Sequence, residues 1–464
     1  MNTKRVFRFL IVAGWMSLPV LSVRSADVVL RRTVLAPGLD EPIAMEVAPD
    51  GSVVLAEHHG ALKLWKPVDG SLRSAGALTV FTGPEDGILG LALDPQYSRN
   101  GWIYLYHSTP GVLENRVSRF TLHDGVLDAT SQKILLRVPT LIPKPNHSGG
   151  CLGFDGVGNL YVSTGDYTYA GQSDGFAPID RRPGHEMNDS ERTAANTLDF
   201  RGKILRIHPE PDGTYSIPPD NLFPKGTPKA LPELYVMGCR NPFRFTLDPK
   251  TGFLYWGDVG PDALGPNPAR GPAGFDEFNM ARKAGNFGWP YFSADNRAYV
   301  AWDFQAKTNG AAFDPAHPAN DSPNNTGLRD LPPAQPAFLW YPPGPSSRWP
   351  EVGSGARSAM AGPVYHFDAA LKSDRKLPRE LDGSVILFEW ERGWIKAAWL
   401  DESGSLKRLD SIRTAEQTKF KRPICAKLGP DGALYVIEWG SNWSGNRDAA
   451  LVRLEGQGGT GDGR

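Results

Sequence analysis

One short pattern of apolar and polar positions recurs along the chain and predicts an all-β fold. In each copy apolar residues alternate with polar ones, a turn rich in Asp, Pro or Gly follows, and a strand rich in Tyr, Val and Leu completes a hairpin. The copies lie at residues 45–57, 89–107, 151–166, 243–260, 383–400 and 426–440. Because one such hairpin cannot bury its apolar face alone, we expect the copies to stack radially as a six-bladed β-propeller.

The remaining segments complete this single propeller domain, which we expect to span residues 26–456. Residues 28–36 and 450–456 read as strands that share a terminal blade, which would remove an open sheet edge. The irregular spacing of the copies predicts long rim insertions. We expect them at about 168–230, which includes a strand at 202–209, and at about 293–347. Residues 457–464 are expected to be a flexible tail.

The N-terminal residues have the order of a secretory signal peptide. Lys4, Arg5 and Arg8 precede an apolar run over 9–21, and small residues follow. We therefore expect residues 1–25 to be a signal peptide, a periplasmic or secreted location, and no stable membrane insertion after cleavage. An uncleaved anchor is the alternative, although the apolar run is short for a membrane span.

Composition and charge narrow the range of partners. Lys and Arg number 50 and Asp and Glu 51, for a formal net charge of −1, so no long-range field attracts nucleic acid. A small neutral or weakly charged ligand fits this balance better. The odd number of cysteines, Cys151, Cys239 and Cys425, leaves at least one unpaired within the chain.

His147 and Asp166 bracket one of the predicted hairpins. Asp166 follows His147 by 19 residues, the length of one strand out and one strand back, so both ends of the hairpin should lie at the same rim. A neutral imidazole suits the removal of a hydroxyl proton near neutral pH, and a carboxylate can fix its tautomer. From these residues alone, the pair is either a loop His beside a turn Asp or a candidate base with its orienting partner.

Several longer motifs resemble one known family. The run 146–166, GKILRIHPEPDGTYSIPPDN (202–221), MGCRNPFRFTLDP (237–249), GDVGPDALGP with GFDEFN (257–279) and GNFGWP (285–290) are similar to the glucose/sorbosone dehydrogenase family. The resemblance runs from about residue 35 to about 455. It implies a six-bladed propeller that carries pyrroloquinoline quinone (PQQ) and Ca²⁺ and oxidises sugars.

The resemblance also implies roles for individual residues. His147 takes the position of the base and Asp166 follows as its partner; Arg240 and Asn241 match the quinone-contacting pair, with Arg240 beside the reacting carbonyls. Three further sets are implied. Arg422 matches an Arg that binds the cofactor carboxylates, Glu85 and Asn146 take substrate positions, and the carbonyls of Gly260 and Pro261 bind Ca²⁺.

Two positions depart from the family pattern. Glu391 stands where the family has a Lys that contacts the quinone, and Ile424 replaces a second Arg of the carboxylate clamp. A carboxylate near a tricarboxylate repels it. We therefore hypothesise that Arg392 turns inward and replaces the missing charge. The cofactor could also bind differently, weakly, or be absent.

Other polar clusters carry weaker interpretations. The acids Asp258, Asp262, Asp276 and Glu277 either form a second calcium site or are solvated loop residues, which is the expectation for most of them. The segment GHEMNDSE, with His185, Glu186, Asp189 and Glu191, invites a metal interpretation, but a solvated polar insertion is expected. His58 and His59 are assigned to the surface or rim of the first hairpin.

Together these features favour an exported quinoprotein that oxidises an aldose, or a related sugar hydroxyl or aldehyde, and passes electrons to a separate acceptor such as a cytochrome or a quinone. A second hypothesis is a Ca²⁺-dependent propeller lactonase or other hydrolase that uses metal-activated water. A third is a non-catalytic propeller that binds carbohydrate or a protein partner, because one fold hosts many functions.

Overall fold

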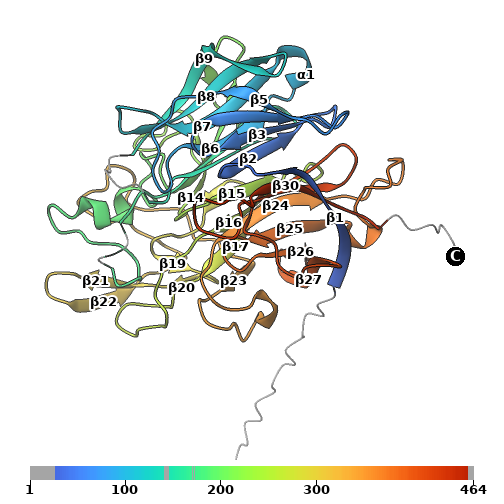
Figure 1. Ribbon diagram of the computed structural model, residues 1–464. Helices are drawn as coiled ribbons and strands as arrows, with labels where there is room; N and C mark the ends of the chain where they lie inside the picture. Colours follow the sequence, from blue (N-terminus) through green and yellow to red (C-terminus); the bar gives the residue numbers. More distant parts are fainter. Residues whose placement is uncertain (1–26, 141–145, 170, 172, 458–464) are drawn as a thin grey trace, which may run out of the picture.

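The computed structural model describes residues 27–140, 146–169, 171 and 173–457 (Figure 1). The predicted signal peptide and residues 458–464 of the predicted tail lie outside the described residues. Strands dominate the described chain, whose one α-helix is the four-residue α1 (Tyr97–Asn100). The 3₁₀ helices are η2 (Glu186–Asn188), η3 (Ser190–Arg192), η4 (Pro350–Val352) and η5 (Arg379–Leu381).

Most neighbouring strands run antiparallel, and the strand order within the sheets mostly follows the chain. One sheet has the order β2 (Pro42–Val47), β3 (Val53–Glu57), β4 (Ala61–Trp65) and β5 (Leu72–Ala77). The next has the order β6 (Ile88–Leu93), β7 (Trp102–Ser108), β8 (Glu114–His123) and β9 (Val126–Pro139). Another has the order β15 (Arg244–Leu247), β16 (Leu254–Asp258), β17 (Asp276–Ala281) and β23 (Leu339–Tyr341).

A further sheet receives strands from distant parts of the chain. Its order is β10 (Gly149–Phe154), β11 (Leu160–Thr164), β12 (Lys203–Pro209), β14 (Leu234–Met237) and β18 (Gly285–Asn286), and β13 (Tyr215–Ser216) pairs with β12. The strand predicted at 202–209 is therefore confirmed. Two small hairpins lie between β18 and β23, namely β19 (Phe292–Ser293) with β20 (Arg297–Ala298) and β21 (Val300–Asp303) with β22 (Thr308–Ala312).

The two ends of the described chain meet in one eight-stranded sheet. Its order is β24 (Ala359–Tyr365), β25 (Ser384–Glu389), β26 (Trp394–Leu400), β27 (Leu406–Thr414), β1 (Asp27–Pro37), β30 (Ala450–Glu455), β29 (Leu434–Glu438) and β28 (Pro423–Leu428). The predicted sharing of a sheet by the two terminal strands is confirmed, because β1 runs antiparallel to β30 (Figure 1). β1 also runs parallel to β27, a pairing that the sequence did not predict.

One edge strand of each large sheet, and both edge strands of the eight-stranded sheet, surround a common centre. β2 contacts β6, β6 contacts β10, β10 contacts β15, β15 contacts β24, β24 contacts β28, and β28 returns to contact β2. The whole is a propeller-like, all-β fold. Strand ends and the loops that join them therefore converge around this centre.

The six predicted hairpins are all confirmed as antiparallel strand pairs. In four of these hairpins one strand is buried on both faces: every residue of β3, β11, β25 and β29 is buried. Neighbouring sheets cover each strand from both sides, so these strands read as nearly continuous apolar runs. All three cysteines are buried and free.

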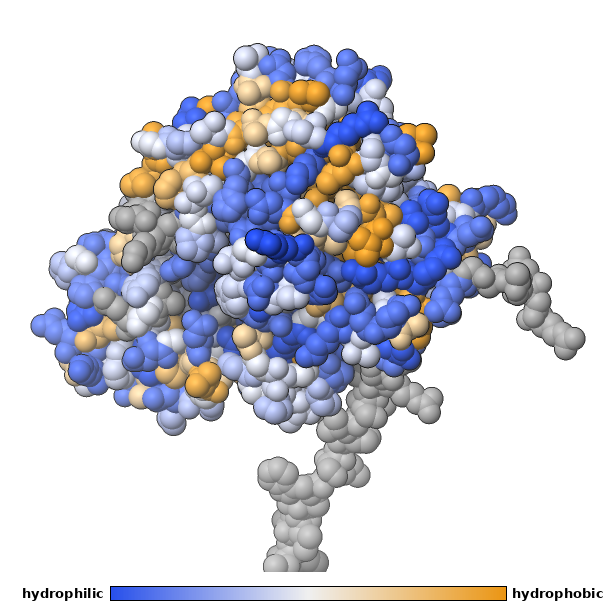
Figure 2. All heavy atoms as spheres, viewed as in Figure 1, coloured by the Kyte–Doolittle hydropathy of each residue, from blue (hydrophilic) through white to orange (hydrophobic). Residues whose placement is uncertain are grey.

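The surface is mainly hydrophilic on the face shown in Figure 2, where hydrophobic residues form small areas separated by hydrophilic ones. Such a surface is readily solvated. Among the described residues, none of the helices has the length and apolar character needed to cross a bilayer.

Candidate active site

His147 and Asp166 meet at one edge of the sheet that β10 and β11 form. Gly149 pairs with Thr164 in this hairpin, so the residues just beyond each end lie side by side. His147 Nδ1 lies 2.7 Å from Asp166 Oδ1. A Cβ atom on Gly165 would lie 1.7 Å from the carbonyl oxygen of His147, so only glycine allows this approach. The hairpin thus brings the imidazole and the carboxylate together.

Asp166 is fully buried and held from several directions. Its Oδ2 accepts hydrogen bonds from Ser190 Oγ (2.7 Å) and Trp289 Nε1 (2.8 Å), and its Oδ1 also accepts from the backbone N–H of Thr168 (3.1 Å). Burial opposes ionisation, but His147, Arg240 and Ser190 outweigh it and hold the pKa of Asp166 below its usual value. An ionised carboxylate only accepts hydrogen bonds, so Nδ1 of His147 carries the proton and Nε2 of the neutral ring is free to accept one.

The backbone of His147 is fixed by a second carboxylate. Its φ angle of 63° is left-handed, which is uncommon outside glycine. Glu85 Oε2 accepts from the N–H groups of His147 (2.8 Å) and Ser148 (3.1 Å), and Asn241 Oδ1 accepts from the N–H of Gly149 (3.0 Å). Glu85 and Asn241 therefore hold the loop that carries the imidazole.

A cleft of about 400 Å³ opens beside His147. Its wall includes the predicted residues Glu85, His147, Arg240, Asn241, Glu391 and Ile424, together with His58, Arg357, Ser358, Trp390, Trp439 and Trp443. The structure thus gathers residues far apart in the sequence around one opening. Asn146 is half-buried next to His147 and is not part of this wall.

Arg240 reaches the cleft with part of its guanidinium unused. Asp258 accepts from the backbone N–H groups of Arg240 (3.1 Å) and Asn241 (2.7 Å), and Arg240 Nη1 donates to the carbonyl of Val259 (2.9 Å). Nε of Arg240 is buried without a hydrogen-bond partner. A buried cationic donor without a partner is costly, so this group is suited to an anionic ligand in the cleft.

Arg422 lies behind the cleft wall and not in it. Its Nη2 is 3.5 Å from Glu391 Oε2, its Nη1 donates to the carbonyl of Ser441, and its guanidinium lies 5.0 Å from the ring of Trp390. Burial raises the pKa of Glu391, while Arg422 opposes that change. Glu391, and not Arg422, presents its side chain to the cleft.

Arg392 also lies away from the cleft. Its guanidinium donates to five backbone carbonyls, those of Pro342, Val352, Gly353, Gly355 and Ala356. It also lies 4.6 Å from the centre of the Tyr341 ring. All of its donors are therefore used to fix the 342–356 loop, and the structure does not bring Arg392 to the position opposite Glu391.

The Gly260–Pro261 turn lies beside the cleft but is already contacted by a cation. Arg357 Nη2 donates to the carbonyl of Pro261 (2.7 Å), and Arg357 also pairs with Asp276 (3.0 Å). Val259 and Asp262, on either side of the turn, line the cleft. A calcium ion at the Pro261 carbonyl would meet a guanidinium there, so these donors fit Ca²⁺ only when Arg357 moves away.

The acids near this turn are mostly not solvated, contrary to expectation. Asp258 and Asp276 are buried and Glu277 is half-buried, and only Asp262 is exposed. Burial raises the pKa of Asp258 to about 7 and, with Asp258 nearby, that of Glu277 to about 8. Backbone N–H groups occupy oxygens of Asp258 and Asp276.

The polar segment around residue 189 is also packed, so its predicted solvation is wrong for two residues. Asp189 and Glu191 are fully buried. Asp189 accepts from Ser322 and Asn324, and Glu191 accepts from Arg181 and Tyr291. These acids join the two long segments that the sequence marked as insertions.

Sequence reasoning missed two residues that hold Asp166, the partner of the base. Trp289 lies in the GNFGWP motif and Ser190 in the polar segment, and both bind Asp166. Arg357 and the three cleft tryptophans were missed as well. The motif around Trp289 was a usable signal, whereas no local pattern marks Ser190 or Arg357.

Comparisons with known proteins agree with this arrangement. The profile of the family described as "Glucose / Sorbosone dehydrogenase" matches residues 39–319. Aldose sugar dehydrogenase YliI of Escherichia coli is 27% identical over 263 residues, which is 55% of this chain and 61% of the relative, so the chain spans about three fifths of that protein's length. Quinoprotein glucose dehydrogenase B of Acinetobacter calcoaceticus is 24% identical over 437 residues, covering 88% of this chain and 84% of the relative.

A solved structure agrees in fold over nearly the whole chain. The "putative oxidoreductase (glucose dehydrogenase)" of Thermus thermophilus superposes with a TM-score of 0.60 at 25% identity, covering 92% of this chain and 99% of that one. The profile match alone extends over more than half of the sequence. The chain belongs to the glucose/sorbosone dehydrogenase family.

Proposed function

We propose that this protein is an exported quinoprotein oxidoreductase that oxidises an aldose, or a related sugar hydroxyl or aldehyde, with PQQ as hydride acceptor and Ca²⁺ in support. The observation that carries the proposal is the His147–Asp166 pair, whose imidazole lines a cleft that Arg240 also lines. Nε of Arg240 is buried without a hydrogen-bond partner. The names of the relatives, one an aldose sugar dehydrogenase and one a quinoprotein glucose dehydrogenase, support the same substrate class and cofactor.

In this proposal His147 is the general base. Asp166 keeps the proton on Nδ1, so Nε2 accepts the proton of the sugar hydroxyl as the C–H bond breaks. The imidazolium that results is stabilised by the ionised Asp166, whose pKa stays low. Glu85 and Asn241 keep the loop in place during this transfer, and the cleft residue Glu85 and the neighbouring Asn146 contact sugar hydroxyls.

The cofactor residues act mainly through charge and shape. PQQ, when bound, supplies the acceptor for the hydride. Arg240 and Asn241 would hold it at the reacting side, with Arg240 Nε donating to an oxygen that gains negative charge. Trp390, Trp439 and Trp443 offer apolar surface to a planar ring. Arg422 would bind the carboxylates of PQQ only by giving up its ion pair with Glu391. Arg392 supports the cleft wall by fixing the 342–356 loop.

The carbonyls of Gly260 and Pro261 are the proposed Ca²⁺ ligands. Ion binding there requires Arg357 to move away from the Pro261 carbonyl.

The remaining parts of the proposal concern architecture and location. We count the eight-stranded sheet as two blades, which gives a six-bladed propeller over residues 26–456 with rim insertions at about 168–230 and 293–347. We also propose removal of the signal peptide 1–25, a periplasmic or secreted location, and a cytochrome or quinone as the separate electron acceptor.

One observation favours a second candidate, a non-catalytic propeller that binds carbohydrate. Glu391 and Ile424 line the cleft at the two positions where the family resemblance implies cationic residues. A carboxylate there disfavours a tricarboxylate ligand and suits hydrogen bonds to sugar hydroxyls.

Reconstitution separates the two candidates. Purified protein is incubated with PQQ and Ca²⁺, and reduction of an artificial electron acceptor is followed with a panel of aldoses. Acceptor reduction that needs both PQQ and a sugar, and that disappears in His147→Ala, supports the oxidoreductase. Saturable sugar binding without quinone uptake or turnover contradicts it and supports the binding protein.

A further inference from the structure

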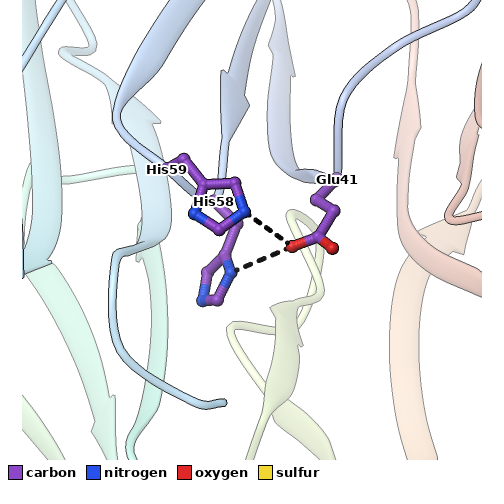
Figure 3. Close-up of side chains that lie close together, drawn as sticks. All are labelled: Glu41, His58 and His59. Carbon is purple, nitrogen blue, oxygen red and sulfur yellow. Dashed lines mark ion pairs between the residues drawn. The ribbon is translucent and has the colours of Figure 1, made fainter. Parts of the chain in front are cut away.

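A second group of potential ligands lies beside the cleft and has no role in the proposed reaction. Glu41, His58 and His59 each offer one ligand atom, and these atoms lie within 4.8 Å of one another (Figure 3). Throughout the described ranges, this is the one place where three His, Cys, Asp or Glu side chains gather so closely. The close-up shows both imidazole rings directed toward one carboxylate oxygen of Glu41.

The first sheet brings these residues together through its own register. Pro42 of β2 pairs with Glu57 of β3, so Glu41 and His58 lie opposite each other just beyond the last pair. The backbone N–H of His58 donates to the carbonyl of Glu41 (2.9 Å) and fixes that juxtaposition. His59 follows in the tight turn to β4, and Glu41 has a left-handed φ of 45°. A non-glycine residue in this conformation is strained, as is common at functional sites.

The distances match those between ligands of one small metal ion. Glu41 Oε2 lies 3.5 Å from His58 Nδ1 and 3.1 Å from His59 Nε2. Tetrahedral Zn²⁺ with bonds of about 2.0–2.2 Å separates neighbouring ligand atoms by roughly 3.3–3.5 Å. The His58 and His59 ligand atoms lie within 4.8 Å of each other, and the side chain of His59 is half-exposed.

The ligand atoms are also in a suitable chemical state. His58 is buried, and its Nδ1 has no hydrogen-bond partner. A nitrogen without a hydrogen-bond partner remains available as a metal ligand. The other oxygen of Glu41 accepts from the N–H of Gly445 (3.2 Å), which orients the carboxylate as outer partners do at metal sites.

We propose that Glu41, His58 and His59 bind one divalent transition-metal ion of the Zn²⁺ class, with an open coordination position toward the cleft. Two imidazole nitrogens and one carboxylate suit Zn²⁺ and its neighbours, whereas Ca²⁺ prefers six to eight oxygens. His58 lines the cleft together with Trp439 and Trp443, so the ion would sit in the wall of the same cavity as His147. The site is separate from the Gly260–Pro261 turn and does not depend on the proposed function.

Metal titration of the untagged, cofactor-free protein tests the site, because a polyhistidine tag would bind the same ions. Co²⁺ binding is followed by its visible absorption and Zn²⁺ binding by calorimetry. We expect one ion per chain, displacement of Co²⁺ by Zn²⁺, and no displacement by excess Ca²⁺. His59→Gln should weaken Zn²⁺ binding by more than about tenfold, since losing even an outer partner of a metal ligand costs about 10- to 100-fold.

Matched variants separate ligand loss from a folding defect. The side chain of His59 is 51% exposed, so His59→Gln should keep the melting temperature of the metal-free protein. The control His317→Gln replaces a His that is 85% exposed and pairs with Asp314, and it should leave Zn²⁺ binding unchanged. Absence of saturable 1:1 binding, equal affinity in His59→Gln and the parent chain, or equal competition by Ca²⁺ would each overturn the proposal.

Discussion

Nδ1 of His147 lies 2.7 Å from a carboxylate oxygen of Asp166, and the other oxygen of that carboxylate is held by Trp289 and Ser190. The carboxylate therefore cannot rotate away from the ring without breaking both of those hydrogen bonds. Its fixed position selects the tautomer with a free Nε2 at the cleft. The chemistry we propose depends on this relationship more than on any other.

Asp166→Asn should reduce kcat by about 10²–10⁴-fold, because an amide NH₂ facing Nδ1 favours the tautomer whose Nε2 is already protonated. KM for the sugar should change little, since Asp166 is fully buried and does not reach the cleft. Steady-state kinetics on the reconstituted protein measure both constants. A variant with unchanged melting temperature and near-normal kcat would show that the carboxylate does not orient the base.

Glu85→Ala should lower kcat roughly tenfold, whereas Glu85→Gln should retain most of the activity. The alanine removes the acceptor for the N–H groups of His147 and Ser148, while glutamine keeps a carbonyl oxygen for them. If instead the charge of Glu85 is needed for sugar binding, Glu85→Gln would raise KM as much as Glu85→Ala. Comparing KM and kcat of the two variants therefore assigns the role.

Glu277→Gln should reduce the loss of folding stability that accompanies a rise in pH. Burial and Asp258 raise the pKa of Glu277 in the folded protein to about 8, above the unfolded value near 4.5. Between these two pKa values the folded state therefore binds more protons than the unfolded state. As pH rises through this window, the free energy of unfolding falls by about 1 kcal/mol per pH unit for one group. Melting temperatures from pH 5 to 9 should fall less steeply in the variant. Parallel curves for the two proteins would contradict the raised pKa.

Arg357→Gln should lower the Ca²⁺ concentration needed for reconstitution by about tenfold or more. The guanidinium now on the Pro261 carbonyl is a positive charge next to the proposed ion, and removing it relieves a repulsion of several kcal/mol at most. Arg357→Lys, which keeps the charge, is the matched control. An identical calcium titration for Arg357→Gln and the parent would place the ion elsewhere.

Local signals allowed much of the fold to be predicted. The six hairpins combine short-range alternation with turn residues such as those of APDG (48–51), so neighbouring residues specify them. The parallel pairing of β1 with β27 brings Asp27 beside Ser411, and no local pattern encodes a contact between segments so distant in the chain. Such pairings depend on how whole sheets pack.

In the site, too, contacts within one hairpin could be predicted and contacts between distant loops could not. The contact between His147 and Asp166 could be predicted because one hairpin separates them. The partners of Arg392 and Arg357 could not, because each guanidinium binds backbone carbonyls that only the folded loops bring within reach. The burial of Glu191 and Asp189 was missed because two of the side chains that bind them lie 100 and 133 residues further along the chain.

Single-turnover reduction of the PQQ-loaded protein by an aldose tests the central claim most directly. His147→Asn is the best variant, because asparagine tolerates the left-handed backbone at this position. Mixing loaded protein with excess sugar, without an electron acceptor, reports the cofactor's absorbance change at the rate of the chemical step. We predict a step at least about 100-fold slower in His147→Asn at neutral pH, with PQQ affinity changed less than about twofold. Equal rates in the two proteins would contradict the assignment of His147 as the base.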